Sequence, residues 1–193
     1  MNILITGFMP FGGDDRNPSF DCLREFPAQI GSTHVTVLEL PVTFRQAPKI
    51  LLGTLEERKP DGVICLGLAA SRKKVTPELA AVNLAHARIP DNEGAQPLEQ
   101  PLIPGGPDGI FSTLPVFELV RRLEQAGIPA ELSCTAGTYV CNSLFYHLMT
   151  WAKPRRVPAG FVHVPNTDTL ALDEIRRAVL IMADCISGKT QDF

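Results

Sequence analysis

The spacing of apolar and polar positions along the chain predicts strands and helices that alternate. Continuous or alternating apolar patterns, typical of buried strands, cover residues 2–6, 33–40, 62–67, 75–84, 130–134 and 159–163. Apolar residues at helical spacing cover residues 20–26, 43–58, 114–125, 144–152 and 172–186. This order predicts a single-domain three-layer α/β/α sandwich with a largely parallel central sheet, extending over residues 1–193.

The predicted strand at 75–84 differs from the others because it contains a carboxylate. Pro77 lacks a backbone N–H, which favours an edge position in the sheet. Glu78 lies among apolar residues, so a buried carboxylate there must find a partner or stay protonated. A solvent-exposed glutamate on the outer face of an edge strand is the alternative, and the pattern leaves both interpretations open.

The stretch from Ala136 to Asn142 presents a cysteine after a predicted strand and a glycine turn, at the start of a helix. The first turn of a helix has unpaired N–H groups and the positive end of the helix dipole, which favour a thiolate over a thiol. Cys141 is therefore a candidate nucleophile. Most free cysteines are small buried hydrophobic residues, and this stretch alone does not separate the two interpretations.

The loop at residues 7–13 is rich in glycine but matches a phosphate-binding loop poorly. It contains neither GxGxxG nor Gly-Lys-Ser/Thr, and Pro10 removes a backbone donor that such a loop would use. Phe8 and Phe11 instead indicate an aromatic wall of a binding site. The same two rings would also be suited to filling the core beneath the loop.

Four of these features come at the ends of predicted strands: the 7–13 loop, the turn at Leu68, Cys141 and His163. Ligands of α/β sheets bind at the carboxyl ends of the strands, so we expect these features at one edge of the sheet. Cys141 and His163 would form a nucleophile–base pair there. An imidazole that acts as a base needs a third group to fix its tautomer, and Glu78 is the candidate.

Composition and charge exclude several classes of function. The chain has 193 residues, 45% hydrophobic and 20% charged, with a net charge of −3 and no run of Lys or Arg. A role on nucleic acid or at a membrane surface is therefore not expected. No stretch approaches transmembrane length and no basic leader precedes the first strand, so we expect a cytoplasmic protein.

The cysteines are not spaced as a disulfide framework or a zinc site. There are five, an odd number, without a CxxC pair. No cluster of metal ligands stands out, so we expect neither a metal nor another cofactor. The four cysteines expected to serve packing alone are Cys22, Cys65, Cys134 and Cys185.

Four segments together resemble the signatures of the pyroglutamyl-peptidase I family, the pyrrolidone-carboxylate peptidases. In chain order they are Gly7-Phe8-x-Pro-Phe11-Gly12 with Asn17-Pro18-Ser19, Gly67-x-Ala69-x-x-Arg72 followed by Glu78-x-x-Ala-x-Asn83, Ala136-Gly137-Thr138-Tyr139-Val140-Cys141-Asn142, and Phe161-Val162-His163-Val164-Pro165. Each segment alone is a weak signal. Their order and spacing over nearly the whole chain make the combined resemblance specific.

The resemblance implies a cysteine exopeptidase that removes an N-terminal pyroglutamyl residue from peptides. Carried over by motif position, Cys141 would be the nucleophile, His163 the general base and then acid, and Glu78 the orienting carboxylate. The Cys141 backbone N–H and Arg88 would lie at the oxyanion. The family's habit further implies a homo-oligomer, a tetramer or a dimer.

The resemblance also implies a pocket for the lactam ring. Its residues would be Phe8, Phe11, Asn17, Leu68, Tyr139 and Val140. Some relatives have glutamine at the position of Leu68 and many have phenylalanine at that of Tyr139, which puts those two contacts in doubt. Pyroglutamate is a neutral five-membered lactam, which suits a small, mostly apolar slot with aromatic walls and few polar contacts.

Two other functions remain alternatives on the sequence. A nucleoside phosphorylase-like enzyme of similar fold would need a phosphate- or ribose-binding loop and basic residues, and the loop at 7–13 argues against it. A small-ligand binding protein with a degenerate site would have lost one of Glu78, Cys141 and His163, yet all three are present.

Overall fold

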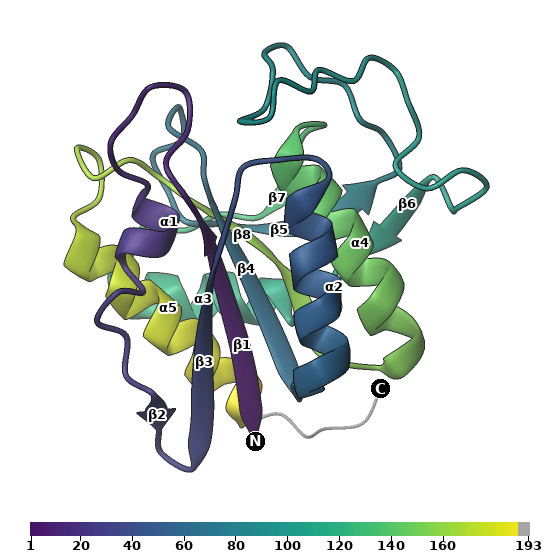
Figure 1. Cartoon of the computed structure of the whole chain (residues 1–193). Coiled ribbons are helices and arrows are strands. Elements are labelled where there is room, and N and C mark those ends of the chain that lie inside the picture. The colour runs from purple at the N-terminus through teal and green to yellow at the C-terminus, as the bar shows by residue number, and fades with distance from the viewer. Residues whose placement is uncertain (189–193) are drawn as a thin grey trace.

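The apolar runs of the sequence form one sheet in the computed structural model, which describes residues 1–188 (Figure 1). The strands are β1 (Asn2–Phe8), β2 (Gln29–Ile30), β3 (Thr33–Leu40), β4 (Gly62–Leu68), β5 (Thr76–Val82), β6 (Gly109–Phe111), β7 (Ser133–Thr135) and β8 (Ala159–Val164). The helices are α1 (Pro18–Asp21), α2 (Gln46–Arg58), α3 (Val116–Gln125), α4 (Val140–Arg155) and α5 (Leu172–Ser187).

The sheet has the strand order β2-β3-β1-β4-β8-β5-β6, with β7 beside β5. Neighbours among β3, β1, β4 and β8 are parallel, whereas β2, β5 and β6 are each antiparallel to the preceding or following strand in that order. β4 lies in the middle of the parallel part and is buried from Gly62 to Gly67. Its continuous apolar sequence reflects this, because helices cover both faces of a parallel sheet.

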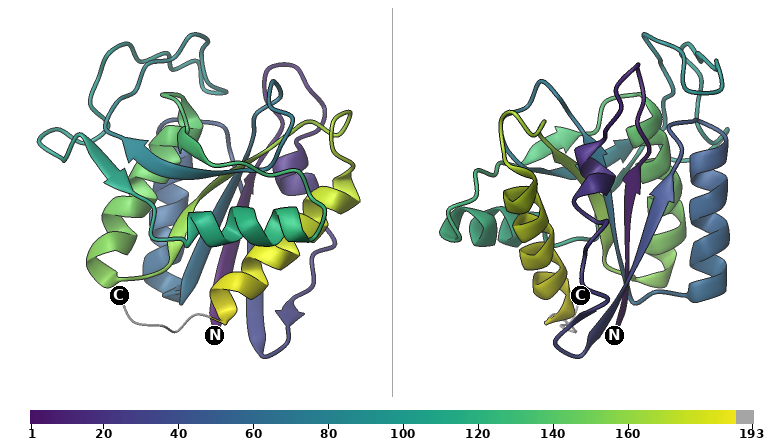
Figure 2. Two further views of the ribbon diagram at one scale, coloured as in Figure 1. Left: turned by 180° about the vertical axis from the view of Figure 1, so that it is seen from behind. Right: turned by 60° about the vertical axis from the view of Figure 1, so that its left-hand side comes forward.

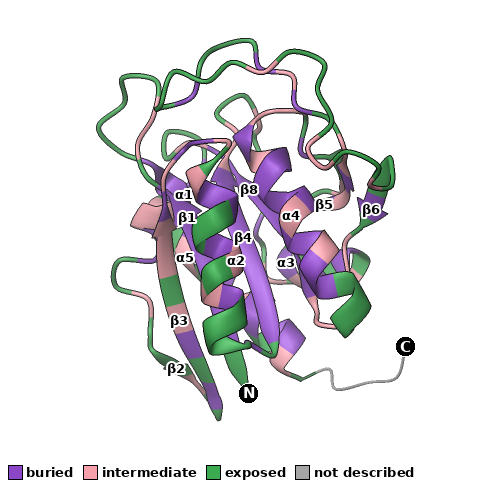
Figure 3. Cartoon of the chain, turned by 45° about the vertical axis from the view of Figure 1, so that its right-hand side comes forward, coloured by how far each residue is buried: buried purple, intermediate pink, exposed green. Residues whose placement is uncertain are grey.

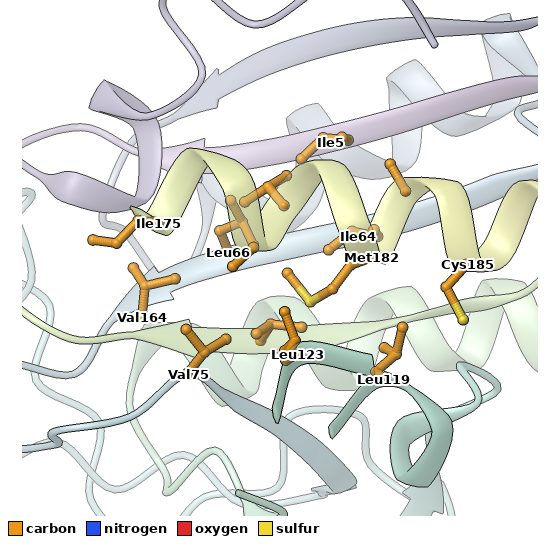
Figure 4. Close-up of a cluster of buried hydrophobic side chains, with 14 of the residues drawn as sticks. Ile5, Ile64, Leu66, Val75, Leu119, Leu123, Val164, Ile175, Met182 and Cys185 are labelled. Carbon is orange, nitrogen blue, oxygen red and sulfur yellow. The ribbon is translucent and has the colours of Figure 1, made fainter. Parts of the chain in front are cut away.

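Helices cover the sheet on both faces and make it the middle of three layers (Figure 2). Side chains of α3 and α5 form one apolar cluster with one face of the sheet, in which Leu123 and Met182 lie near Ile64 and Leu66 (Figure 4). Side chains of α2 and α4 form a second cluster with the opposite face. Figure 3 shows buried residues along the central strands and exposed residues on the outer side of the helices. The predicted α/β/α sandwich is confirmed.

The predicted edge position of Pro77 is wrong. β5 lies between β8 and β6, and Pro77 is paired with Val162 of β8. The proline is tolerated because it is only the second residue of its strand, where β5 and β8 pair over just Thr76 and Pro77. The exposed edge glutamate that this position allowed is excluded as well, because Glu78 is fully buried.

Several elements also differ from the predicted ones in length. The short helix expected at 20–26 is α1 at Pro18–Asp21, and the strand expected at 130–134 is β7 at Ser133–Thr135. β6 forms in the stretch between 84 and 114, for which the sequence pattern predicted neither strand nor helix, because it pairs with Val82, Ala81 and Ala80 rather than following a periodic pattern of its own. Cys134 is exposed on β7, so the prediction that it serves packing is wrong.

The extent of the domain to residue 193 stays a prediction, because residues 189–193 lie outside the described part of the chain. Among the helices of residues 1–188, none combines the length and apolarity that crossing a membrane would require.

Candidate active site

The Glu78 carboxylate lies at the junction of β5 and β8 and is fully buried. Its Oε1 accepts two hydrogen bonds, one from the Nδ1 of His163 at 2.7 Å and one from the Nη1 of Arg72 at 2.6 Å. An ionised carboxylate only accepts hydrogen bonds, so Nδ1 of the imidazole carries the proton and Nε2 keeps its lone pair. The structure therefore brings together the two residues that the sequence predicted to be a base and its orienting group.

The turn after β4 supplies Arg72, which the sequence placed in a motif without giving it a role. The Arg72 N–H donates to the Ala69 carbonyl at 2.9 Å, and the Ala69 N–H donates to the Val164 carbonyl at 3.0 Å. This turn holds the arginine against the ends of β4 and β8. The Arg72 guanidinium also donates to the Oγ1 of Thr76, the residue paired with His163 across the two strands.

Cys141 is the second residue of α4, after the N-cap Tyr139. The N-terminus of α4 lies close to β4 because β4 has a glycine at this point. A Cβ on Gly67 would lie 3.0 Å from the Cys141 Sγ and 2.7 Å from the Phe161 ring. Gly67 is paired with His163 in the β4–β8 ladder. The thiol therefore lies over the strand that borders the imidazole, as the sequence predicted.

The Cys141 thiol and His163 both lie next to Gly67, and the described part of the chain has no hydrogen bond between them. Hydrogen bonds of catalytic pairs are often long before substrate binds, so this geometry does not conflict with a nucleophile–base pair. The Cys141 N–H, in the first turn of α4, has no backbone carbonyl as acceptor among residues 1–188 and lies toward its own thiol, whose pKa it lowers. It is available to an anion that forms next to the sulfur.

Electrostatics of the site favour a thiol rather than a thiolate at rest. Desolvation by the surrounding protein raises the pKa of Cys141 to about 12, although the residue keeps some contact with solvent. The negative charge of Glu78 contributes to this increase, whereas the positive charge of Arg72 opposes it. The helix start alone therefore does not produce the thiolate that the sequence suggested, and a proton acceptor is needed.

Glu78 and His163 are held in the charge states that such an acceptor requires. Burial raises the pKa of the Glu78 carboxyl, but the hydrogen bond and charge of His163, the nearby Ser133 hydroxyl and the charge of Arg72 together outweigh burial, so the pKa lies below its ordinary value. Burial lowers the pKa of His163 below its ordinary value despite the attraction of Glu78. An ionised carboxylate and a neutral imidazole follow at neutral pH.

Aromatic rings pack beside the imidazole. The rings of Phe161 and His163 have centroids 4.9 Å apart, and the ring of Phe8 is 6.4 Å from that of Phe161. Phe8 is almost fully buried, so it fills the core beneath its loop as well as standing beside the site. Phe11 is only partly buried and lies 6.5 Å from the ring of Tyr139. Phe8 therefore fills the core beneath the loop, whereas Phe11 as an aromatic wall of a binding site stays a prediction.

The other predicted pocket residues lie at the same edge of the sheet or in the loops above it. Leu68 ends β4 and is partly buried, and Val140 is buried in the first turn of α4. The Asn17 side chain caps α1 and donates from Nδ2 to the Met9 carbonyl at 2.9 Å, so it fixes the loop at 7–13. Arg88 is exposed and makes no hydrogen bond or ion pair within residues 1–188. The contacts of all these residues with a substrate stay predictions.

Asp91 ties the loop that follows Arg88 to the aromatic residues, a role that the sequence analysis missed. Its Oδ2 accepts from the Phe44 N–H at 2.8 Å, and the Phe44 ring packs edge-on against Tyr139 with centroids 5.4 Å apart. The Tyr139 hydroxyl donates to the Pro90 carbonyl at 3.0 Å. The sequence shows only an aspartate in a polar turn. Its burial and the loops that it joins are revealed by the fold.

Asn142 is a second residue whose role the sequence analysis missed. Its side chain is fully buried and makes three hydrogen bonds to β5 and the residues after it. Nδ2 donates to the carbonyls of Val82 at 2.9 Å and Leu84 at 3.0 Å, and Oδ1 accepts from the Val82 N–H at 3.0 Å. The residue next to the cysteine therefore joins α4 to the strand that carries Glu78.

The described residues contain no group of three or more His, Cys, Asp or Glu side chains arranged to hold a metal ion. The chemistry available at this edge of the sheet is that of a thiol, an imidazole and two charged groups. Such a set is suited to nucleophilic attack on a carbonyl carbon.

Comparisons with known proteins agree with this chemistry. A family model described as pyroglutamyl peptidase matches residues 1–187. A pyrrolidone-carboxylate peptidase of Streptococcus pyogenes serotype M4 is 41% identical over 192 residues, covering 93% of this chain and 89% of that relative. The solved pyroglutamyl peptidase I of Bacillus amyloliquefaciens has a TM-score of 0.93 and 37% identity, covering 100% of this chain and 99% of that one. The pyrrolidone carboxyl peptidase from Thermococcus litoralis has a TM-score of 0.92 and 36% identity, with coverages of 97% and 93%.

Proposed function

Since the chain belongs to the pyroglutamyl peptidase family of cysteine peptidases, we propose that it removes the N-terminal pyroglutamyl residue from peptides through Cys141, His163 and Glu78. The observation that carries this assignment is the buried hydrogen bond from His163 to Glu78, next to a cysteine at a helix start. Membership of the family sets aside the alternative of a nucleoside phosphorylase-like enzyme.

The proposed reaction begins with proton transfer from the Cys141 thiol to Nε2 of His163. The sulfur attacks the carbonyl carbon that follows the lactam ring, and the resulting oxyanion accepts a hydrogen bond from the Cys141 N–H. Because the pKa of the thiol is raised to about 12, we expect proton transfer and attack to be coupled. The imidazolium that forms is stabilised by the Glu78 carboxylate.

The second half of the reaction uses the same groups in reverse. His163 donates its proton to the departing amine, and the C–N bond breaks to leave a thioester on Cys141. A water molecule, deprotonated by His163, then attacks the thioester, which releases pyroglutamate and restores the thiol. We propose Arg88 as a further contact of the oxyanion.

We propose that the lactam ring binds between two aromatic pairs. Phe11 and Tyr139 lie on one side, and Phe8 and Phe161, beside His163, lie on the other. A neutral ring without an amine needs apolar walls and few polar contacts, which these residues offer. Asn17 and Leu68 are proposed to border the slot. The Asn17 side chain already makes hydrogen bonds within its loop, so its contact with a lactam would use a remaining amide hydrogen.

The function is tested by release of a fluorogenic amine from a pyroglutamyl amide in the presence of reductant. The prolyl and glutamyl amides are the controls, because one lacks the lactam carbonyl and the other lacks the ring. We expect cleavage of the pyroglutamyl amide alone and no cleavage by the Cys141→Ala variant. Cleavage of none of the three by folded, reduced protein would favour a binding protein with a degenerate site.

The remaining proposals concern the setting of the enzyme. We propose that its substrates are peptides with an N-terminal pyroglutamate, that it acts in the cytoplasm and that it forms a homo-oligomer, a dimer or a tetramer. Phe111 and Phe117 are 59% and 69% exposed, and large exposed aromatic residues of this kind are common in protein interfaces. Sedimentation velocity of the purified chain measures the assembly directly.

A further inference from the structure

Glu78 must remain an acceptor of hydrogen bonds if His163 is to act as a base. A protonated Glu78 would donate to Nδ1, which would move the imidazole proton to Nε2. With its proton on Nε2, the imidazole could not accept the proton of Cys141. The charge state of a fully buried carboxyl therefore selects between an active and an inactive tautomer of His163.

Burial disfavours the ionised form of Glu78, whereas all of its partners favour it. His163 and the nearby Ser133 hydroxyl lower the pKa of the carboxyl, but a neutral imidazole and a hydroxyl carry no permanent positive charge. Oε2 of Glu78 is buried without a hydrogen-bond partner within residues 1–188, and the hydrogen bonds from Arg72 and His163 both go to Oε1. Of the two donors to Oε1, Arg72 is the one that keeps its charge at every pH at which the enzyme would act.

We propose that Arg72 is the positioning residue that keeps Glu78 ionised and thereby selects the His163 tautomer with the proton on Nδ1. This role deepens the proposed function and rests on it only for its effect on catalysis. An arginine side chain has hydrogen-bond donors and no acceptor, so the Nη1 of Arg72 can bond to Oε1 only while this oxygen acts as an acceptor. The same guanidinium contacts Thr76, which is paired with His163, and so holds both sides of the junction.

Burial and charge around Arg72 and Glu78 are consistent with this role of Arg72. The Arg72 side chain is 27% exposed, whereas that of Glu78 is 0% exposed, so the guanidinium stays partly hydrated while it neutralises a dry carboxylate. The titratable groups that act on the charge of the imidazole are Glu78 and Arg72, and the Cys141 thiol lies beside the same Gly67 as His163. Those that face the thiol are Glu78, Arg72, Cys65 and Tyr139. Arg72 is the one cation in this described set.

The charge of Arg72 also acts on the two groups that exchange the proton. It lowers the pKa of Cys141 and that of His163. Removing the charge would therefore raise both values, so that a higher pH would be needed to deprotonate the pair. This effect differs from a loss of stability, which would lower activity at every pH alike.

The tautomer is measured by NMR of protein labelled with 15N-histidine, which contains only four histidines. His163→Gln assigns the resonance. We expect the Nδ1–H tautomer in the parent protein and a substantial fraction of the Nε2–H tautomer in Arg72→Gln. Arg72→Lys, which keeps the charge, should retain the parent tautomer. Arg176→Gln is the matched control, because Arg176 is 22% exposed and pairs with a carboxylate on α5, away from the site.

The second readout is the pH dependence of Cys141 alkylation by iodoacetamide, followed by mass spectrometry of its peptide. We expect Arg72→Gln to slow alkylation about tenfold at pH 7, the equivalent of a shift of about one pH unit, and Arg72→Lys to stay within about threefold of the parent. An unchanged tautomer and an unchanged alkylation profile in Arg72→Gln would overturn the proposal. Equal effects of both substitutions would also overturn it, because they would exclude the charge as the cause.

Neither readout uses a substrate, so failure of this proposal is distinguishable from failure of the proposed function. A parent protein that does not cleave pyroglutamyl amides but has the expected tautomer would contradict only the function. If Arg72→Gln does not fold, Arg72→Lys still tests the proposal, because a change of its tautomer to Nε2–H would contradict a role of the charge.

Discussion

At the level of single residues, the chemistry depends on one oxygen atom. Oε1 of Glu78 accepts from a histidine that must gain and lose a proton and from an arginine that never does. The imidazole is thereby fixed in its tautomer while its other nitrogen stays free. The thiol, in contrast, is not preset as a thiolate, because desolvation outweighs the helix start.

Glu78→Gln tests the orienting role directly. We expect kcat for a pyroglutamyl amide to fall by about 100-fold or more, because the amide neither stabilises the imidazolium nor holds one tautomer. KM should change much less, since Glu78 is buried behind His163. Steady-state kinetics measure both values. Glu131→Gln, which removes an exposed carboxylate paired with Lys74, is the control, and an equal loss in both variants would contradict the assignment.

At the level of elements, the site depends on how α4 is joined to β5. The start of α4 can lie close to β4 because Gly67 has no side chain. Asn142 holds the helix to the end of β5. The long irregular segment after β5 is likewise fastened: Asn83 donates to the Ile103 carbonyl, and the Tyr146 hydroxyl donates to the Pro107 carbonyl. The nucleophile and the carboxylate are therefore positioned by side-chain to backbone bonds rather than by one continuous element.

Asn142→Ala should lower the free energy of unfolding by about 2 to 4 kcal/mol. The substitution leaves the Val82 N–H and the carbonyls of Val82 and Leu84 without their partner in a buried place. Urea unfolding measures the change. Asn166→Ala, which removes only a bond to the neighbouring Thr167 N–H, should cost no more than about 1 kcal/mol. An Asn142 variant as stable as the parent would show that the three bonds do not join the elements.

At the level of the whole molecule, the site makes the fold sensitive to acid. The pKa of Glu78 is lower in the folded than in the unfolded chain, so its contribution to stability is present above the ordinary carboxyl pKa and is lost as pH falls through the folded value. The pKa of His163 is also lower in the folded chain. The unfolded chain therefore binds a proton first as pH falls below about 6.5, and stability declines. Both groups act in the same direction.

We therefore expect the free energy of unfolding to fall as pH is lowered from 7 to 4, by up to about 1.4 kcal/mol per pH unit for each proton taken up. Urea titrations at a series of pH values measure this slope. His163→Gln should reduce the slope between pH 7 and 5, whereas His34→Gln, at an exposed position, should leave it unchanged. A slope that does not respond to His163→Gln would contradict the assignment of this proton to the site.

The sequence by itself determined the elements and the kinds of residues available for chemistry. Apolar runs predicted β3 with its exact ends and β1, β4 and β8 closely, because burial on both faces leaves a local pattern. Cys141 and His163 were identified from a helix start and a strand end, and Glu78 as a carboxylate within an apolar stretch.

Only the tertiary structure decided what surrounds those residues. Glu78 and His163 are 85 positions apart in the sequence, and Asn142 and Val82 are 60 positions apart. A local pattern of apolar and polar residues carries no information about contacts over such separations. The inner position of β5 depends on pairing with β8 and β6, so neither the burial of Glu78 nor its contact with Arg72 could be read from segment 75–84. Periodicity reports which face of an element is buried, whereas the partner of a buried charge is set by packing between elements.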